Sequence, residues 1–259
     1  MQGVRVWTSS LDRAAGEAGR LFELLSPVER SRAARFHNER DRRRFVVARG
    51  TLRTLLGDHA GLAPERVPIT TQPGGKPVLA VSDSIHFNVS HCGELALFAI
   101  ADREIGIDLE RLNQTNDIAR VAAHFFAPEE SAAFERLDEP ERARFFFRTW
   151  VRKEAYLKAS GKGFAIDPAK VRISEFSREG ITVEDENGAR AIDHKHAIHD
   201  IPGIAGHAAA IAIAYTASST ISALPSSLSA GREECWRVRS LTGIPATMSS
   251  TPTSDGPGA

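Results

Sequence analysis

The sequence predicts an α+β fold of two similar halves, because a long helix followed by strand-like runs occurs once in each half of the chain. Its 259 residues suffice for one large domain or two small ones. A composition of 42% hydrophobic and 25% charged residues excludes collagen-like, coiled-coil and wholly disordered classes. We expect the halves to span residues 1–104 and 105–215 and to meet near 102–106, although no residue-level repeat accompanies the repeated order.

Side-chain periodicity predicts two long helices and five strands. The first helix is expected over 40–56 with a stop at Gly57, and the second over 140–160 with a stop at Gly161. The helical spacing is carried by Phe45, Ala48, Leu52, Leu55 and Leu56 in the first helix and by Phe146, Trp150, Ala155 and Leu157 in the second. Strand-like runs cover 84–89, 95–101, 106–110, 171–173 and 207–215.

The last 44 residues, 216–259, differ in composition from the rest of the chain. They contain 24 Ser, Thr, Pro or Gly residues and too few large apolar side chains to offset the entropy of ordering. We therefore expect this tail to be disordered, with one short segment, 235–238, able to dock on the body.

Charge and cysteine content exclude several classes of function. Lys plus Arg and Asp plus Glu both total 33, so no global charge imbalance indicates nucleic acid or membrane binding. Two distant cysteines, Cys92 and Cys235, are too few for a disulfide framework or a zinc site. No long apolar run indicates a signal peptide or a membrane span, so we expect a cytoplasmic protein.

Acidic residues alternate with apolar ones in the strand-like run 106–110. This spacing places Asp108 and Glu110 on the same face of a strand, where hard oxygen ligands of this kind suit Mg²⁺. The alternative is a solvent-facing edge strand with no bound ion.

The second helix carries Trp150, Glu154 and Lys158 at intervals of four residues, which places an aromatic, an acid and a base on one stripe. An ordinary exposed Glu–Lys pair is the alternative. Lysine usage favours a functional role, because only 6 of the 33 basic residues are lysines and three of these, Lys153, Lys158 and Lys162, fall within ten positions.

Two further groups of residues indicate an anionic ligand. The turn 74–77 presents Lys76, and Ser90 and His91 end a strand at a loop, an arrangement that suits phosphate binding better than a hydrolase pair. Residues 30–53 hold nine arginines, which either line an exposed helix face or meet a phosphorylated ligand or an acidic partner protein.

Together these segments resemble the 4′-phosphopantetheinyl transferases of the Sfp type. The resemblance covers residues 26–215 and rests on five motifs in the family's order. They are G-K-P at 75–77, F-N-V-S-H at 87–91, G-I-D-L-E at 106–110, F-F-A-P-E-E at 125–130 and W-V-R-K-E-A-Y-L-K-A-S-G-K-G at 150–163.

The resemblance implies two similar halves related by a pseudo-twofold axis, with coenzyme A and Mg²⁺ in the cleft between them. It implies transfer of the phosphopantetheine arm of coenzyme A to a serine of an acyl or peptidyl carrier protein of nonribosomal peptide or polyketide synthesis, with release of adenosine 3′,5′-bisphosphate. A monomer is expected. The alternatives are a Mg²⁺-dependent hydrolase of a nucleotide diphosphate such as coenzyme A, and a non-catalytic protein that binds coenzyme A or a carrier.

The resemblance also implies roles for individual residues, matched motif by motif. The metal-binding acids are Asp108, Glu110 and Glu154, and the catalytic residues are Glu154, Lys158 and Glu130, the last near the metal. The coenzyme-A-binding residues are Arg32, Arg44, Gly75, Lys76, Pro77, Ser90, His91, Asp108, Lys153 and Lys158. At Glu29 some relatives carry a second basic residue, so we expect Arg32 and neighbouring arginines to bind the 3′-phosphate.

Overall fold

The computed structural model describes residues 3–112, 117–162, 166–173, 181–184, 188–215 and 238–240. The first half of the chain contains β1 (Arg5–Ser10), α1 (Ala15–Glu23), α2 (Pro27–Ala33), α3 (Glu39–Ala60), η1 (Pro64–Arg66), β2 (Ile69–Thr71), β3 (Pro77–Leu79), β4 (His86–Cys92) and β5 (Leu95–Ala101). The second contains β6 (Ile105–Arg111), α4 (Ile118–Phe125), α5 (Pro128–Glu135), α6 (Glu141–Ser160), η3 (Pro168–Lys170), β7 (Val171–Ile173), β8 (Ile181–Glu184), β9 (Arg190–Ile192), β10 (His196–Asp200) and β11 (His207–Ala214).

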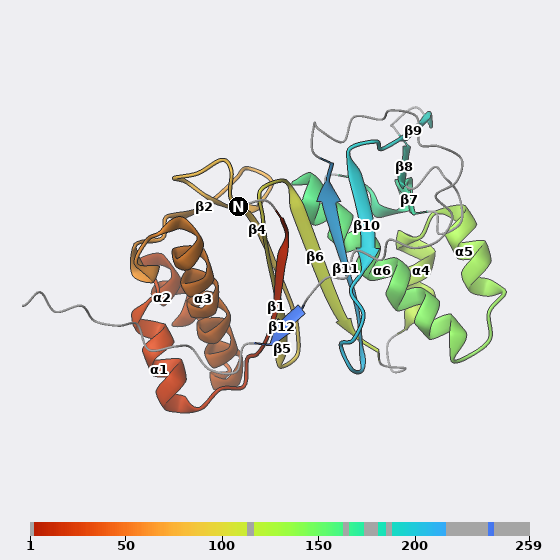
Figure 1. Ribbon diagram of the computed structural model, residues 1–259. Coiled ribbons are helices and arrows are strands. Elements are labelled where there is room, and N and C mark those ends of the chain that lie inside the picture. The colour runs from red at the N-terminus through yellow and green to blue at the C-terminus, as the bar shows by residue number, and fades with distance from the viewer. Residues whose placement is uncertain are drawn as a thin grey trace, which may run out of the picture.

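The two halves use the same strand connectivity. In the first, β5 pairs antiparallel with both β1 and β4; in the second, β11 pairs antiparallel with both β6 and β10. Helices α1–α3 lie at one end of the row of strands and α4 and α5 at the other, whereas α6 runs behind β6 and β11 (Figure 1). The predicted α+β class is therefore confirmed, and the repeated connectivity agrees with two similar halves, whereas the twofold axis stays a prediction.

The predicted elements differ from the observed ones mainly at their ends. The second helix is confirmed as α6, which stops at Gly161 in the left-handed conformation with φ of 68°. The first helix, α3, continues past Gly57 and stops at Gly61, with φ of 66°. Gly57 is a packing position instead, because a Cβ there would lie 2.7 Å from the carbonyl oxygen of Leu62.

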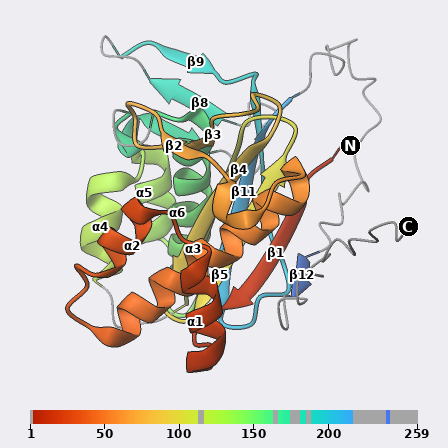
Figure 2. The same cartoon turned by 90° about the vertical axis from the view of Figure 1, so that its left-hand side faces the viewer.

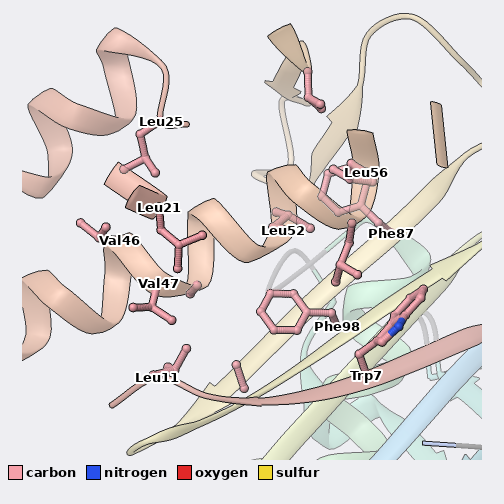
Figure 3. Packing of buried hydrophobic residues seen from close by; sticks show 14 of the residues in the cluster. Trp7, Leu11, Leu21, Leu25, Val46, Val47, Leu52, Leu56, Phe87 and Phe98 are labelled. Atoms are coloured by element: carbon pink, nitrogen blue, oxygen red, sulfur yellow. The ribbon is translucent and has the colours of Figure 1, made fainter. Parts of the chain in front are cut away.

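The core of the first half lies between its helices and its sheet. Leu21 of α1 and Leu52 of α3 face Trp7 of β1 and Phe98 of β5, and all four side chains are buried (Figure 3). In the second half, α6 packs directly on β6 and β11, with its buried face against Ala210 and Ala212. Because α6 rests on the sheet in this way, it can present side chains to β6.

The two main sheets meet where β4, the edge strand of the first sheet, lies beside β6, the edge strand of the second. The Asn88 side chain bridges them, since its Oδ1 accepts a hydrogen bond from the backbone N–H of Ile107 at 3.0 Å.

A short strand from the predicted tail, β12 (Val238–Ser240), pairs in parallel with β1 on the opposite edge (Figure 2). The other tail residues lie outside the described ranges, as does Gly163 of the fifth motif. None of the helices described is long and apolar enough to span a membrane.

Candidate active site

Three elements enclose a cavity of about 360 Å³, which we call the acidic cavity. It lies where β4, β6 and α6 come together, so residues from both halves of the chain reach it. Its lining consists of Val89, Ser90, His91, Asp108, Glu110, Trp150, Glu154 and Lys158. The structure thus brings together the three acids predicted to bind metal, together with Lys158, Ser90 and His91.

Gly106 allows α6 to lie against β6 closely enough for these side chains to meet. A Cβ on Gly106 would lie 2.1 Å from the carbonyl oxygen of Ala155 and 2.3 Å from the backbone nitrogen of Ala159. Any side chain at this position would therefore push α6 away from the strand. The glycine in the G-I-D-L-E motif sets the distance between Asp108 on β6 and Lys158 on α6.

Asp108 is the most buried acid of the cavity, with a relative exposure of 3%. Its Oδ1 accepts hydrogen bonds from Lys158 Nζ at 2.6 Å and from Ser90 Oγ at 2.8 Å. Its Oδ2 is buried and has no hydrogen-bond partner among the described residues. Buried carboxylate oxygens rarely lack a partner, so this atom marks a place for a further ligand.

The other two acids lie in an environment that disfavours negative charge. Burial raises the pKa of Glu154, and the charges of Asp108 and Glu110 raise it further against the opposing effect of Lys158. Burial and the charge of Asp108 likewise raise the pKa of Glu110, although hydrogen bonds from Cys92 and Trp150 partly offset them. A cation between these carboxylates would relieve their repulsion.

The chemistry of the donors fits a divalent cation. The cavity offers hard carboxylate oxygens, one of them buried and unpartnered, as Mg²⁺ prefers. As the side chains stand, no three His, Cys, Asp or Glu residues in the described ranges are close enough together to hold an ion. Lys158 instead supplies the positive charge beside Asp108.

A second, larger cavity of about 810 Å³ adjoins the first, and we call it the arginine pocket. The two share Val89, His91 and Lys158 in their walls. The predicted ligand-binding residues that line the arginine pocket are Arg32, Arg44, Gly75, Lys76, Pro77, His91 and Lys158. Together the cavities form one continuous site that is acidic at one end and mainly basic at the other.

The basic residues of the arginine pocket are held in different ways. Arg44 donates two hydrogen bonds of 2.7 Å to Asp12, whereas the Arg32 guanidinium lies over the Phe45 ring, 5.2 Å from its centre. Lys76 Nζ donates to the carbonyl oxygen of Ala159 at 2.8 Å, and burial lowers its pKa. Lys76 therefore ties the 74–77 turn to the last turn of α6.

Two of the predicted site residues lie outside both cavities. Lys153 and Glu130 line neither cavity; they form a buried ion pair of 2.7 Å, with side-chain exposures of 1% and 6%. Glu130 also accepts hydrogen bonds from the backbone nitrogens of Ala127 and Ile173, and Lys153 donates to the carbonyl oxygen of Pro168. Because adjacent helical residues point about 100° apart, Lys153 faces away from the side on which Glu154 lies.

Sequence analysis missed several residues of the site. Phe36, Phe45 and Arg49 line the arginine pocket, but the sequence indicated Phe45 only as part of a helix face and Arg49 only as one of nine arginines. The spacing of Phe45 and Arg49 by four positions on the predicted helix could have placed both on the same face as Leu52. The contribution of Phe36 depends on how α2 turns into α3, for which the sequence carries no comparable signal.

Two family models match consecutive parts of the chain. The model of the 4′-phosphopantetheinyl transferase N-terminal family matches residues 12–103, and that of the 4′-phosphopantetheinyl transferase superfamily matches residues 104–214.

Individual relatives carry the same name. The 4′-phosphopantetheinyl transferase HetI of Nostoc sp. is 40% identical over 166 residues, which cover 62% of this chain and 70% of HetI. A 4′-phosphopantetheinyl transferase of Bacillus subtilis is 29% identical over 187 residues, covering 70% of this chain and 82% of that protein. Sfp of Bacillus subtilis is 27% identical over 173 residues, covering 66% and 76% respectively. By these matches the chain belongs to the 4′-phosphopantetheinyl transferase superfamily and is an enzyme of that family.

Proposed function

We propose that this enzyme transfers the 4′-phosphopantetheine arm of coenzyme A to a serine of an acyl or peptidyl carrier protein in a Mg²⁺-dependent reaction. The second product is adenosine 3′,5′-bisphosphate. The carriers belong to nonribosomal peptide or polyketide synthesis, as the Sfp-type resemblance implies. The enzyme acts as a monomer in the cytoplasm.

The continuity of the acidic cavity with the arginine pocket is the observation that carries this proposal. Coenzyme A bears a diphosphate in its middle and a phosphomonoester at one end, so it needs positive charge at two separate places. Lys158 stands in the wall shared by the cavities, and the arginines line the larger one. A ligand with its diphosphate beside Lys158 would therefore extend its nucleotide toward the arginines.

The three acids of the acidic cavity would hold the metal. Asp108, Glu110 and Glu154 are its ligands in this proposal, and the ion when bound supplies positive charge that neutralises the diphosphate. The remaining catalysis consists of positioning and electrostatic stabilisation, as is general for phosphoryl transfer. Lys158 stabilises the charge that develops on the leaving bisphosphate, and Ser90 holds the carboxylate of Asp108 in place.

The acceptor serine must lose its proton as it attacks. Its oxygen forms a bond to the phosphorus on the pantetheine side of the diphosphate, and the bond from that phosphorus to the bridging oxygen breaks. Glu154 is the base in this proposal, because its carboxylate lines the acidic cavity, where one oxygen can bind the metal and the other can accept the proton. Glu130 is not available for this role, since both of its oxygens are engaged by Lys153 and backbone N–H groups.

A mass measurement tests the proposal. The protein is incubated with coenzyme A, Mg²⁺ and an apo carrier protein, and the carrier is weighed by mass spectrometry. We expect a gain of one phosphopantetheine, no gain with a chelator, and no gain with Glu154→Gln, whose circular dichroism should match the wild type. Breakdown of coenzyme A without a carrier gain would support the hydrolase, and binding with neither reaction would support a non-catalytic protein.

A further inference from the structure

Glu29 of α2 is a buried acid at the junction of two helices, with a relative exposure of 7%. Both of its oxygens are in use. Oε2 accepts from the backbone N–H of Ser26 at 2.9 Å and from Arg53 Nε at 2.5 Å. Oε1 accepts from Nε and Nη2 of Arg49 at 2.9 and 2.6 Å. One carboxylate therefore joins the first turn of α2 to two arginines of α3.

The two arginines that Glu29 holds have different surroundings. Arg53 is 3% exposed, and its Nη1 donates to the carbonyl oxygens of Pro64 and Val67 at 3.0 and 3.1 Å, so its role is structural. Arg49 lines the arginine pocket, and it donates to Glu29 through its Nε and Nη2. Glu29 thus fixes one edge of the Arg49 guanidinium and leaves the other edge to the pocket.

Arg49 and Arg32 lie in the wall of the arginine pocket but not in that of the acidic cavity. If the diphosphate of coenzyme A lies beside Lys158, the ligand group that reaches these arginines is the phosphomonoester. A planar guanidinium binds a phosphate best when its plane is fixed in advance, because less side-chain freedom is lost on binding.

We propose that Glu29 is a positioning residue for coenzyme A, which it serves by orienting Arg49 toward the 3′-phosphate. The inference rests on the proposed function.

Calorimetric titration of the full-length protein with coenzyme A and with 3′-dephospho-coenzyme A tests this role. We expect Arg49→Gln to raise the Kd for coenzyme A about tenfold and Glu29→Gln to raise it several-fold, since a charge-assisted hydrogen bond to phosphate is lost or misaligned. The Kd for 3′-dephospho-coenzyme A should stay within about twofold in both variants, a selectivity that a general loss of packing would not produce.

A double-variant cycle separates positioning from helix packing. In the Arg49→Gln background, Glu29→Gln should have no further effect on the Kd for coenzyme A. Glu39→Gln is the matched control and should leave the Kd for coenzyme A unchanged, because Glu39 accepts two hydrogen bonds from Arg42 at an exposed position and neither residue lines the two cavities.

Equal weakening of both ligands, or an undiminished effect of Glu29→Gln without Arg49, would overturn the inference. If Glu29→Gln does not fold, Arg49→Gln with the two ligands still decides it. A wild type that binds coenzyme A but modifies no carrier would instead contradict the proposed function and leave the role of Glu29 in binding intact.

Discussion

Buried carboxylates occur both in the Glu29 cluster and in the acidic cavity, but their surroundings are opposite. Burial acts to raise the pKa of Glu29, yet the N–H of Ser26 and the guanidinium groups of Arg49 and Arg53 outweigh it, and the pKa is lowered. Burial also acts on Glu154, where the neighbouring carboxylates add to it and the pKa is raised.

This difference separates an acid that stabilises the fold from acids that bind a metal in the proposed function. Glu29 has its cations within the chain and pairs with Arg49, which lines the arginine pocket. The acidic cavity holds three carboxylates and one lysine, so a further cation would offset the excess of negative charge. Strained electrostatics of this kind are typical of functional sites rather than of structural ones.

The largest effect is expected from breaking the buried ion pair of Lys153 and Glu130, whose charges compensate each other as those of Glu29 and its arginines do. Lys153→Met removes the partner of Glu130 and should lower the free energy of unfolding by about 3–5 kcal/mol, because an uncompensated charge is left buried. Urea unfolding followed by circular dichroism measures it. The double variant Lys153→Met/Glu130→Leu should regain most of the lost stability. A Lys153→Met protein with normal stability and weakened coenzyme A binding would instead show that Lys153 belongs to the ligand site.

Removing an acid of the second kind should affect the reaction and spare the fold. Asp108→Asn is expected to lower kcat/KM for carrier modification about 100- to 1000-fold, the usual loss for one preorganised electrostatic group. The melting temperature should change little. Glu39→Gln, which alters an exposed carboxylate paired with Arg42, serves as the control and should retain full activity. Normal turnover by Asp108→Asn would contradict the assignment of the acidic cavity.

The close approach of α6 to β6 can be tested at Gly106. Gly106→Ala should destabilise the protein by about 1–3 kcal/mol through overpacking, and activity should fall as Glu154 and Lys158 move away from Asp108. Gly19→Ala is a control of opposite sign, because Gly19 lies within α1 with open space around it and alanine favours the helix. Thermal unfolding measures the stability of both variants. A Gly106→Ala protein as stable as the wild type would contradict the close approach of α6 to β6.

The smallest and most specific effect concerns pH. Because the pKa of Glu29 is lowered, its stabilisation is present above its ordinary value near 4.5 and is lost as the pH falls, so Glu29→Gln should destabilise most near pH 7. Because the pKa of Glu154 is raised, its ionisation destabilises the folded protein as the pH rises above about 4.5.

In the presence of a chelator, Glu154→Gln should therefore stabilise the protein at pH 7 and have no effect near pH 4. Thermal melts of both variants across this range measure the two slopes. Added Mg²⁺ should raise the melting temperature of the wild type at pH 7 more than that of Glu154→Gln. If the stability of both variants relative to the wild type changed in the same direction with pH, Glu29 and Glu154 would not be two different kinds of acid.

The acids and Lys158 were predictable because strand and helix periodicities are local. A spacing of two on a strand and four on a helix gave the shared faces of Asp108 with Glu110 and of Glu154 with Lys158, and the structure has these four in one cavity. The position of Lys153 was not predictable in this way. Resemblance assigned it to the ligand, whereas its direction depends on where α5 and β7 pack around α6.

The Asn88 bridge has a consequence for the space in which the reaction takes place. At this seam a side chain, and not a backbone carbonyl, accepts the hydrogen bond from β6, so the two sheets stay separate. Ser90, two residues along β4, and Asp108, next to Ile107 on β6, both lie beside this link and line the acidic cavity. An amide at position 88 thus ties the sheets together next to the cavity, whereas a backbone ladder along the same seam would merge them into one sheet of seven strands.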